Sequence, residues 1–150
     1  MALHDHTHPD ALEKYSFLWS EARLIIASVA LLLGGVPPAF LFVSGPMSLG
    51  IIALLLKLSW IISGLSAAYL AYRWYEGGQM LFGKKDSKDT AAFAIAIISG
   101  FNLGITGIMG KNIGMAISSS HLVFNVVAVL YIASAIYLFT RWNSFGRKIF

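Results

Sequence analysis

Cysteine is absent from the 150 residues of this chain, and charged residues make up only 12% of it. Without cysteine the protein has no disulfide, thiolate metal site, iron–sulfur cluster or cysteine nucleophile. Ordinary globular proteins carry about 25% charged residues, so this chain has too few charges to cover a surface exposed to water. The two absences exclude cysteine chemistry and disfavour a soluble domain.

Apolar residues take the place of the missing charges, at 57% of the chain. A helix needs about 20 mostly apolar residues to cross roughly 30 Å of hydrocarbon. Four runs of this kind occur, at 24–43, 49–72, 90–109 and 117–140. They predict a single all-α membrane domain over residues 1–150, with four transmembrane helices in an antiparallel bundle.

The N-terminal region carries no basic stretch of the kind that opens a cleavable signal peptide, so we expect the first span to be retained. His4, His6 and His8 alternate with other residues, but a solvated, disordered tail over 1–9 accounts for them without a metal or other cofactor. Residues 10–23 show helical spacing of apolar side chains, with Asp10 and Glu13 placed as an N-terminal cap. They predict a short amphipathic approach helix in the interface, or else a plain extension of the first span.

A break is expected inside the first span. Proline lacks the amide donor of a helix interior and glycine weakens the turn before it, so the helix should kink or end in this segment. The residues that carry this expectation are Gly34, Gly35, Pro37 and Pro38.

Basic residues are distributed very unevenly between the two sides of the predicted bundle. One side holds only Lys111, and the other holds Lys14, Arg23, Arg73, Lys84, Lys85, Lys88, Arg141, Arg147 and Lys148. Because cytoplasmic loops carry the excess of lysine and arginine, both termini and loop 73–89 are predicted in the cytoplasm, with the protein in the plasma (inner) membrane. The basic residues are interpreted as membrane anchors and not as nucleic-acid contacts.

Polar residues recur at one depth within the expected spans. Lys57, Asn102 and Asn125 each lie about 10–12 Å from the outer ends of their helices, at about 1.5 Å of rise per residue. All seven acidic residues lie outside the four expected spans, so Lys57 has no carboxylate at its own depth. That distribution argues against proton or cation coupling through a carboxylate within the membrane.

Two further side chains belong to this layer by helical spacing. Thr106 follows Asn102 by one turn, and His121 precedes Asn125 by one turn. The predicted substrate or ion site is therefore Lys57, Asn102, Thr106, His121 and Asn125. The alternative is that asparagine and lysine only join helices together, with no ligand.

The third span carries small residues four apart, at Ala96, Gly100 and Gly104. Such a stripe permits close approach of a second helix, so these residues are predicted to pack helices together.

Three functions are compatible with these patterns. The first is a small channel or transporter, homo-oligomeric, whose polar layer around Lys57 passes a small solute, with an anion among the candidates. The second is a non-catalytic membrane subunit or scaffold that docks other transmembrane helices. A membrane enzyme comes third, because no acidic residue in a span could orient His121 towards the preceding serines, and we expect no enzymatic activity.

The absence of cysteine makes the predicted topology directly testable by single-cysteine labelling. Cysteines placed at Ser87 and Asn143 should react with an impermeant thiol reagent only from the cytoplasm, and one at Asn112 only from outside. Labelling of the Ser87 variant from outside in intact cells would contradict the predicted orientation.

Overall fold

The computed structural model describes residues 8–34 and 49–150. These residues form an all-helical structure, and four of the helices are long and apolar enough to cross a membrane. In chain order the helices are α1 (Pro9–Leu32), α3 (Leu49–Glu76), α4 (Ser87–Met109), α5 (Ile113–Ile117) and α6 (His121–Ser144). The predicted set of four long apolar helices in an antiparallel arrangement is confirmed.

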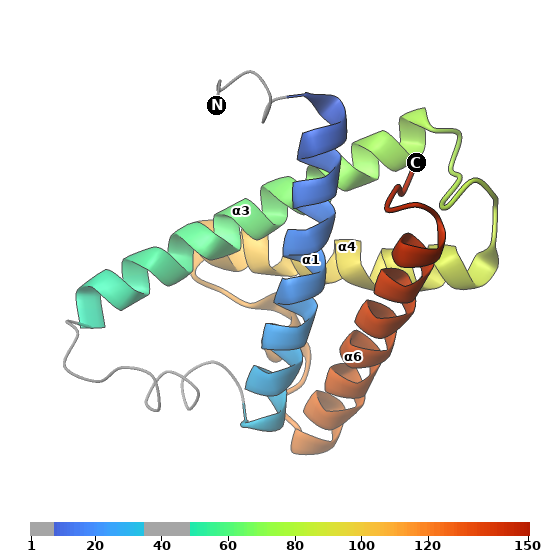
Figure 1. The fold of residues 1–150 in the computed structure, drawn as a ribbon. Helices are drawn as coiled ribbons and strands as arrows, with labels where there is room; N and C mark the ends of the chain where they lie inside the picture. The colour runs from blue at the N-terminus through green and yellow to red at the C-terminus, as the bar shows by residue number, and fades with distance from the viewer. Residues whose placement is uncertain (1–7, 35–48) are drawn as a thin grey trace.

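The four long helices associate as two antiparallel pairs. The most extensive contacts join α3 to α4 and α1 to α6, and smaller contacts join α1 to α3 and α4 to α6. Figure 1 shows the α3–α4 pair crossing the α1–α6 pair, so that the pairs meet along only part of their lengths. The bundle is therefore closely packed at the crossing and more open away from it.

The contact between α3 and α4 depends on glycine. A Cβ atom added to Gly64 would lie 2.7 Å from the Cα of Gly104, closer than real Cβ atoms come to a backbone atom. A Cβ added to Gly100 would meet Ala67 and Ser63, so the close approach extends one turn further along α4. Small residues let two helix backbones touch in this way, and van der Waals packing then holds them together.

The polar end of the bundle is closed by the loop between α3 and α4 and by the C-terminal tail. Leu81 and Phe82 are buried, and the Phe82 amide donates to the Ile149 carbonyl at 2.7 Å. Buried Asp89 accepts two hydrogen bonds from the Arg141 guanidinium, at 2.9 and 3.0 Å. A paired, bidentate geometry of this kind compensates the carboxylate for its loss of water.

The ends of α4 are well defined. Asp86 caps the first turn by accepting from the Lys88 amide at 2.8 Å. This bond, together with the nearby Lys84 ammonium, holds the pKa of the Asp86 carboxyl below its usual value. At the other end Gly110 adopts φ +71°, a left-handed conformation that commonly ends helices.

The first helix differs from the expected span of 24–43. Residues 10–23 are continuous with residues 24–32 in one helix, so no separate approach helix is formed. Its N-cap residue is His8 and not Asp10, and Pro9 occupies the first turn, where a missing amide donor costs nothing. The sequence predicts that the span begins after the last charge, but three charged residues of α1, Glu13, Glu21 and Arg23, are buried in the structure.

The expected break falls mostly outside the described residues. α1 ends at Leu32 and the chain turns at Gly34, which adopts φ +91°. Gly35, Pro37 and Pro38 lie outside the described part of the chain, as does the expected N-terminal tail apart from its last two residues.

The other elements differ from expectation at their ends. α3 and α4 extend further into the expected polar loop of 73–89, which leaves residues 77–86 between them. Residues 113–117 form the separate helix α5, and the fourth long helix starts at His121 instead of Ile117.

The glycine contact predicts a matched difference between two alanine substitutions. Gly104→Ala adds a methyl group against the backbone of α3, whereas Gly50→Ala on α3 adds one where no atom lies within 4 Å. Alanine gains about 1 kcal/mol of propensity at Gly104 in the helix interior and less at Gly50, the second residue of α3. The overpacking cost of about 1–3 kcal/mol should therefore leave Gly104→Ala the less stable of the two. Thermal unfolding in detergent measures the difference, and equal melting temperatures would contradict the proposed contact.

Candidate functional site

A cavity lies between the two helix pairs, on the side of the bundle away from the chain termini. Its volume is about 110 Å³, enough for several water molecules at roughly 10–15 Å³ each. The walls come from α1, α4, α5 and α6 and are mainly apolar. Its polar lining residues are Ser99, Asn102, Asn112, Ser118 and Tyr131.

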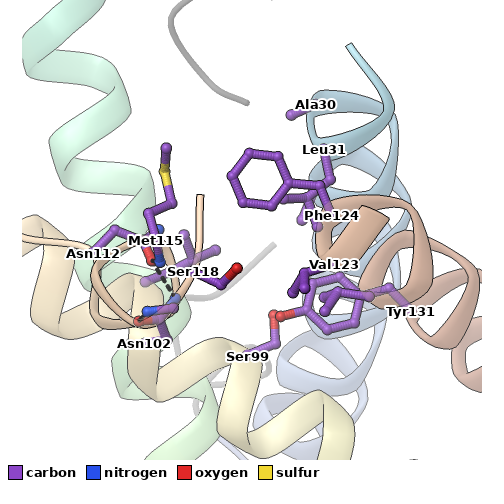
Figure 2. Close-up of a pocket in the computed structure, with 14 residues that line it drawn as sticks. Ala30, Leu31, Ser99, Asn102, Asn112, Met115, Ser118, Val123, Phe124 and Tyr131 are labelled. Atoms are coloured by element: carbon purple, nitrogen blue, oxygen red, sulfur yellow. Dashed lines mark hydrogen bonds between the residues drawn. The ribbon is translucent and has the colours of Figure 1, made fainter. Parts of the chain in front are cut away.

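One wall is organised by two asparagines. Asn102 donates to the Asn112 side-chain oxygen at 3.0 Å and accepts from the amide of Ile113 at 3.0 Å (Figure 2). The Asn112 oxygen also accepts from the Met115 amide at 3.1 Å, which caps α5. The side chain of Asn102 therefore holds in place the connection between α4 and α5, which lines the cavity.

The inner end of the cavity is polar. Ser99 of α4 and Tyr131 of α6 extend towards one another there, as Figure 2 shows. Each hydroxyl group can both donate and accept a hydrogen bond, so this end is equipped to orient a small polar molecule. The apolar lining residues of the same helix, α6, include Phe124 and Val127.

A buried arginine lies beyond this inner end. Arg23 is only 5% exposed, and its Nη2 donates to the Ala96 carbonyl at 2.7 Å. Its Nη1 occupies the space beside Gly100, where an added Cβ would lie 2.5 Å away. Ala27 and Ser99, which line the cavity, follow Arg23 and Ala96 by one helical turn or less. The guanidinium is thus about one turn deeper than the cavity.

A carboxyl group is buried on the same helix. Glu21 is 6% exposed, and neither of its side-chain oxygens has a hydrogen-bond partner. The neighbouring Ser20 hydroxyl is also buried without a partner. Glu21 lies one turn after Phe17, whose ring contacts Trp142 of α6, so by helical spacing it belongs to the face of α1 that packs against α6.

The residues of the predicted polar layer are not gathered at one site. Only Asn102 lines the cavity. Thr106 is buried, and its hydroxyl donates to the Asn102 carbonyl of its own helix at 2.7 Å. Lys57, His121 and Asn125 are exposed on the outer surface of the bundle.

Sequence reasoning assigned Arg23 to the cytoplasmic flank and Glu21 to a region outside the spans. Both lie within α1, which is one of the four candidate spans. One signal could have identified them: no glycine or proline occurs from residue 10 to residue 33, so nothing interrupts a helix through both charges.

Metal binding has no support in the described residues. Within residues 8–34 and 49–150, no group of three or more histidine or acidic side chains is placed to hold a metal ion.

Comparison of the chain with protein-family models, with curated proteins and with solved structures finds no match. The function therefore has to be argued from the site itself.

The two asparagines that sequence reasoning placed at the same depth should respond differently to substitution. Asn102→Leu removes the hydrogen bonds that hold α5 and should cost about 1–3 kcal/mol, because buried partners lose their bonds. Asn125→Leu changes an exposed side chain and should leave stability unchanged or raise it.

Thermal unfolding in detergent measures both effects, and trypsin cleavage after the exposed Lys111 reports loosening of the α4–α5 connection. Faster cleavage is expected for Asn102→Leu alone. Equal stability and equal cleavage of the two variants would contradict the role given to Asn102.

Proposed function

We propose that this chain is a small multi-pass membrane transporter or channel that binds a small solute in the cavity between its helix pairs. The observation that carries the proposal is a cavity with apolar walls and several convergent polar groups, placed between elements that cross at only one region. Sites of this composition are the usual form of a small-molecule site. Spaces between the helices of a bundle are among the usual positions of such sites.

The two-pair architecture supports movement of solute past the cavity. The loop between α3 and α4 and the C-terminal tail hold one end of the bundle together. The opposite end is held by fewer buried side chains, and the cavity lies there. A change in the angle between the pairs would open or close the cavity without breaking either pair.

The orientation that accompanies this proposal places both termini in the cytoplasm of a plasma (inner) membrane protein. Most lysine and arginine residues belong to the segments at the end of the bundle that holds the loop 77–86 and the C-terminal tail. The cavity then faces the outside. Arg23 no longer counts towards this asymmetry because it is buried within α1.

A second candidate function is that of a subunit that associates through its outer surface, with a second copy of this chain as the simplest partner. Lys57, His121 and Asn125 are exposed on apolar helices. A lysine facing lipid costs about 2.5–3.5 kcal/mol on insertion scales, which favours protein over lipid around Lys57. If the wild-type protein in detergent has the mass of an oligomer and the Lys57→Met variant has the mass of a monomer, association through this surface is supported. An unchanged mass, or a wild-type protein that is already monomeric, would count against it.

Transport through the cavity is tested in proteoliposomes by light scattering, with chloride, formate, urea and glycerol as probes. We expect the wild-type protein to accelerate entry of at least one probe. Ala27→Phe should reduce that entry by about tenfold or more because the ring fills the cavity, and pore size limits passage.

The matched control is Ala22→Phe, which places the same ring on the exposed face of α1. Its flux should equal that of the wild type, as should the flux of Lys57→Met, since Lys57 lies outside the cavity. Four probes that enter no faster than into protein-free vesicles, or equal flux in both phenylalanine variants, would contradict the proposal.

A further inference from the structure

Arg23 brings a positive charge into the bundle that its protein contacts do not neutralise. Its Nη2 atom donates to the Ala96 carbonyl, but Nε and Nη1 are buried without a hydrogen-bond partner. A guanidinium does not lose its proton in proteins, so the charge cannot be removed by deprotonation. A buried charge of this kind is strongly unfavourable unless an anion or further acceptors compensate it.

No acidic residue of the described chain forms an ion pair with Arg23. Four of them form ion pairs with basic side chains other than Arg23, namely Glu13, Glu76, Asp86 and Asp89. Asp10 lies near His8 at the exposed start of α1. Glu21 is two residues from Arg23 and interacts with it electrostatically, but the two side chains form no ion pair. No carboxylate among the described residues therefore contacts the guanidinium within 4 Å.

The Arg23 guanidinium lies beside the cavity and is not part of its lining. Nη1 lies against Gly100, the residue after Ser99, and Ser99 lines the cavity. Tyr131 lies near enough to interact electrostatically with Arg23, and its side chain also lines the cavity. The two lining residues with hydroxyl groups at this end are thus close to a fixed positive charge. In a medium of low dielectric constant that charge acts strongly over several ångströms.

We propose that the cavity is an anion site, in which the Ser99 and Tyr131 hydroxyls donate to a small monovalent anion and Arg23 supplies the compensating charge. The class comprises halides, nitrate and short carboxylates such as formate. A single fixed charge favours a single negative charge, and the cavity of about 110 Å³ holds ions of this size. The inference rests on the proposed function, since it names the substrate class of that same cavity.

The test is thermal unfolding of the purified full chain in detergent, at constant ionic strength, with gluconate replaced stepwise by chloride, nitrate or formate. Gluconate is the largest of the four anions and serves as the reference. At about a hundredfold excess over its Kd, a bound anion should raise the Tm by about 4 °C or more. Arg23→Gln should abolish this rise.

Two variants serve as matched controls. Arg147→Gln removes an exposed arginine from the C-terminal tail and should keep the full rise in Tm. Arg23→Lys retains the charge and should keep part of the rise. If none of the three anions raises the Tm of the wild type, or if Arg23→Gln shows the same rise, the anion site is overturned.

A further variant decides the matter if Arg23→Gln does not fold. The double change Ser99→Ala with Tyr131→Phe removes both hydroxyl donors and adds no volume. It should weaken the affinity for anions by about a hundredfold or more, since each lost donor to a charged group lowers affinity about tenfold or more. An unchanged response in the double variant would overturn the proposal.

Failure of the anion site and failure of transport give different results. If anions raise the Tm but no probe enters vesicles faster, the anion site is supported and the transport proposal is contradicted. If Ala27→Phe blocks the flux of urea or glycerol and no anion changes the Tm, the transport proposal is supported and the anion site is contradicted.

Discussion

The close approach of α3 and α4 is the constraint on which the rest of the bundle depends. Where Gly64 faces Gly104, the two backbones leave no room for a Cβ atom. This contact positions the carbonyl groups and small side chains of α4 against α1. Arg23 then has space beside Gly100 and an acceptor at Ala96. A larger residue at Gly100 would displace the guanidinium as well as the helix, so packing and electrostatics are coupled there.

Burial is distributed unequally along the bundle, and the functional proposals follow from that inequality. Buried side chains of the core include Phe17, Leu70, Leu81 and Trp142, which belong to the end that carries the loop and the tail. The other end contains the cavity and the short helix α5. A protein in lipid gains little from the hydrophobic effect between helices, so glycine contacts and paired charges carry more of the stability than they would in water.

Sequence reasoning identified what depends on composition and spacing, and it missed what depends on tertiary contacts. Runs of apolar residues predicted four long helices, because the length needed to cross a bilayer is set by geometry alone. The spacing of Gly100 and Gly104 indicated the helix face that lies against α3. Depth along the helix did not reveal which way a side chain points, and for that reason Lys57 could not be told from Asn102.

Charged residues caused the other differences. Arg23 was expected to mark the membrane boundary, because basic residues usually lie in water next to a span. Its actual environment depends on the Ala96 carbonyl, 73 residues away in the chain, and no local pattern reports that contact. The role of Asn102 likewise depends on the path of residues 110–120, which sequence spacing does not define.

The position of α1 has a consequence for the order in which the protein assembles. α3 and α4 are neighbours in the chain and can pair as soon as both are inserted, whereas the main partner of α1 is α6, which follows both of them in the chain. Of the four candidate spans, α1 also has the lowest mean hydropathy, and it carries Glu21 and Arg23. α1 is therefore the helix that most needs contacts with other helices, and its main partner is synthesised after α3 and α4. Insertion of α1 is the step at which biogenesis of this protein would depend most on assistance from outside the chain.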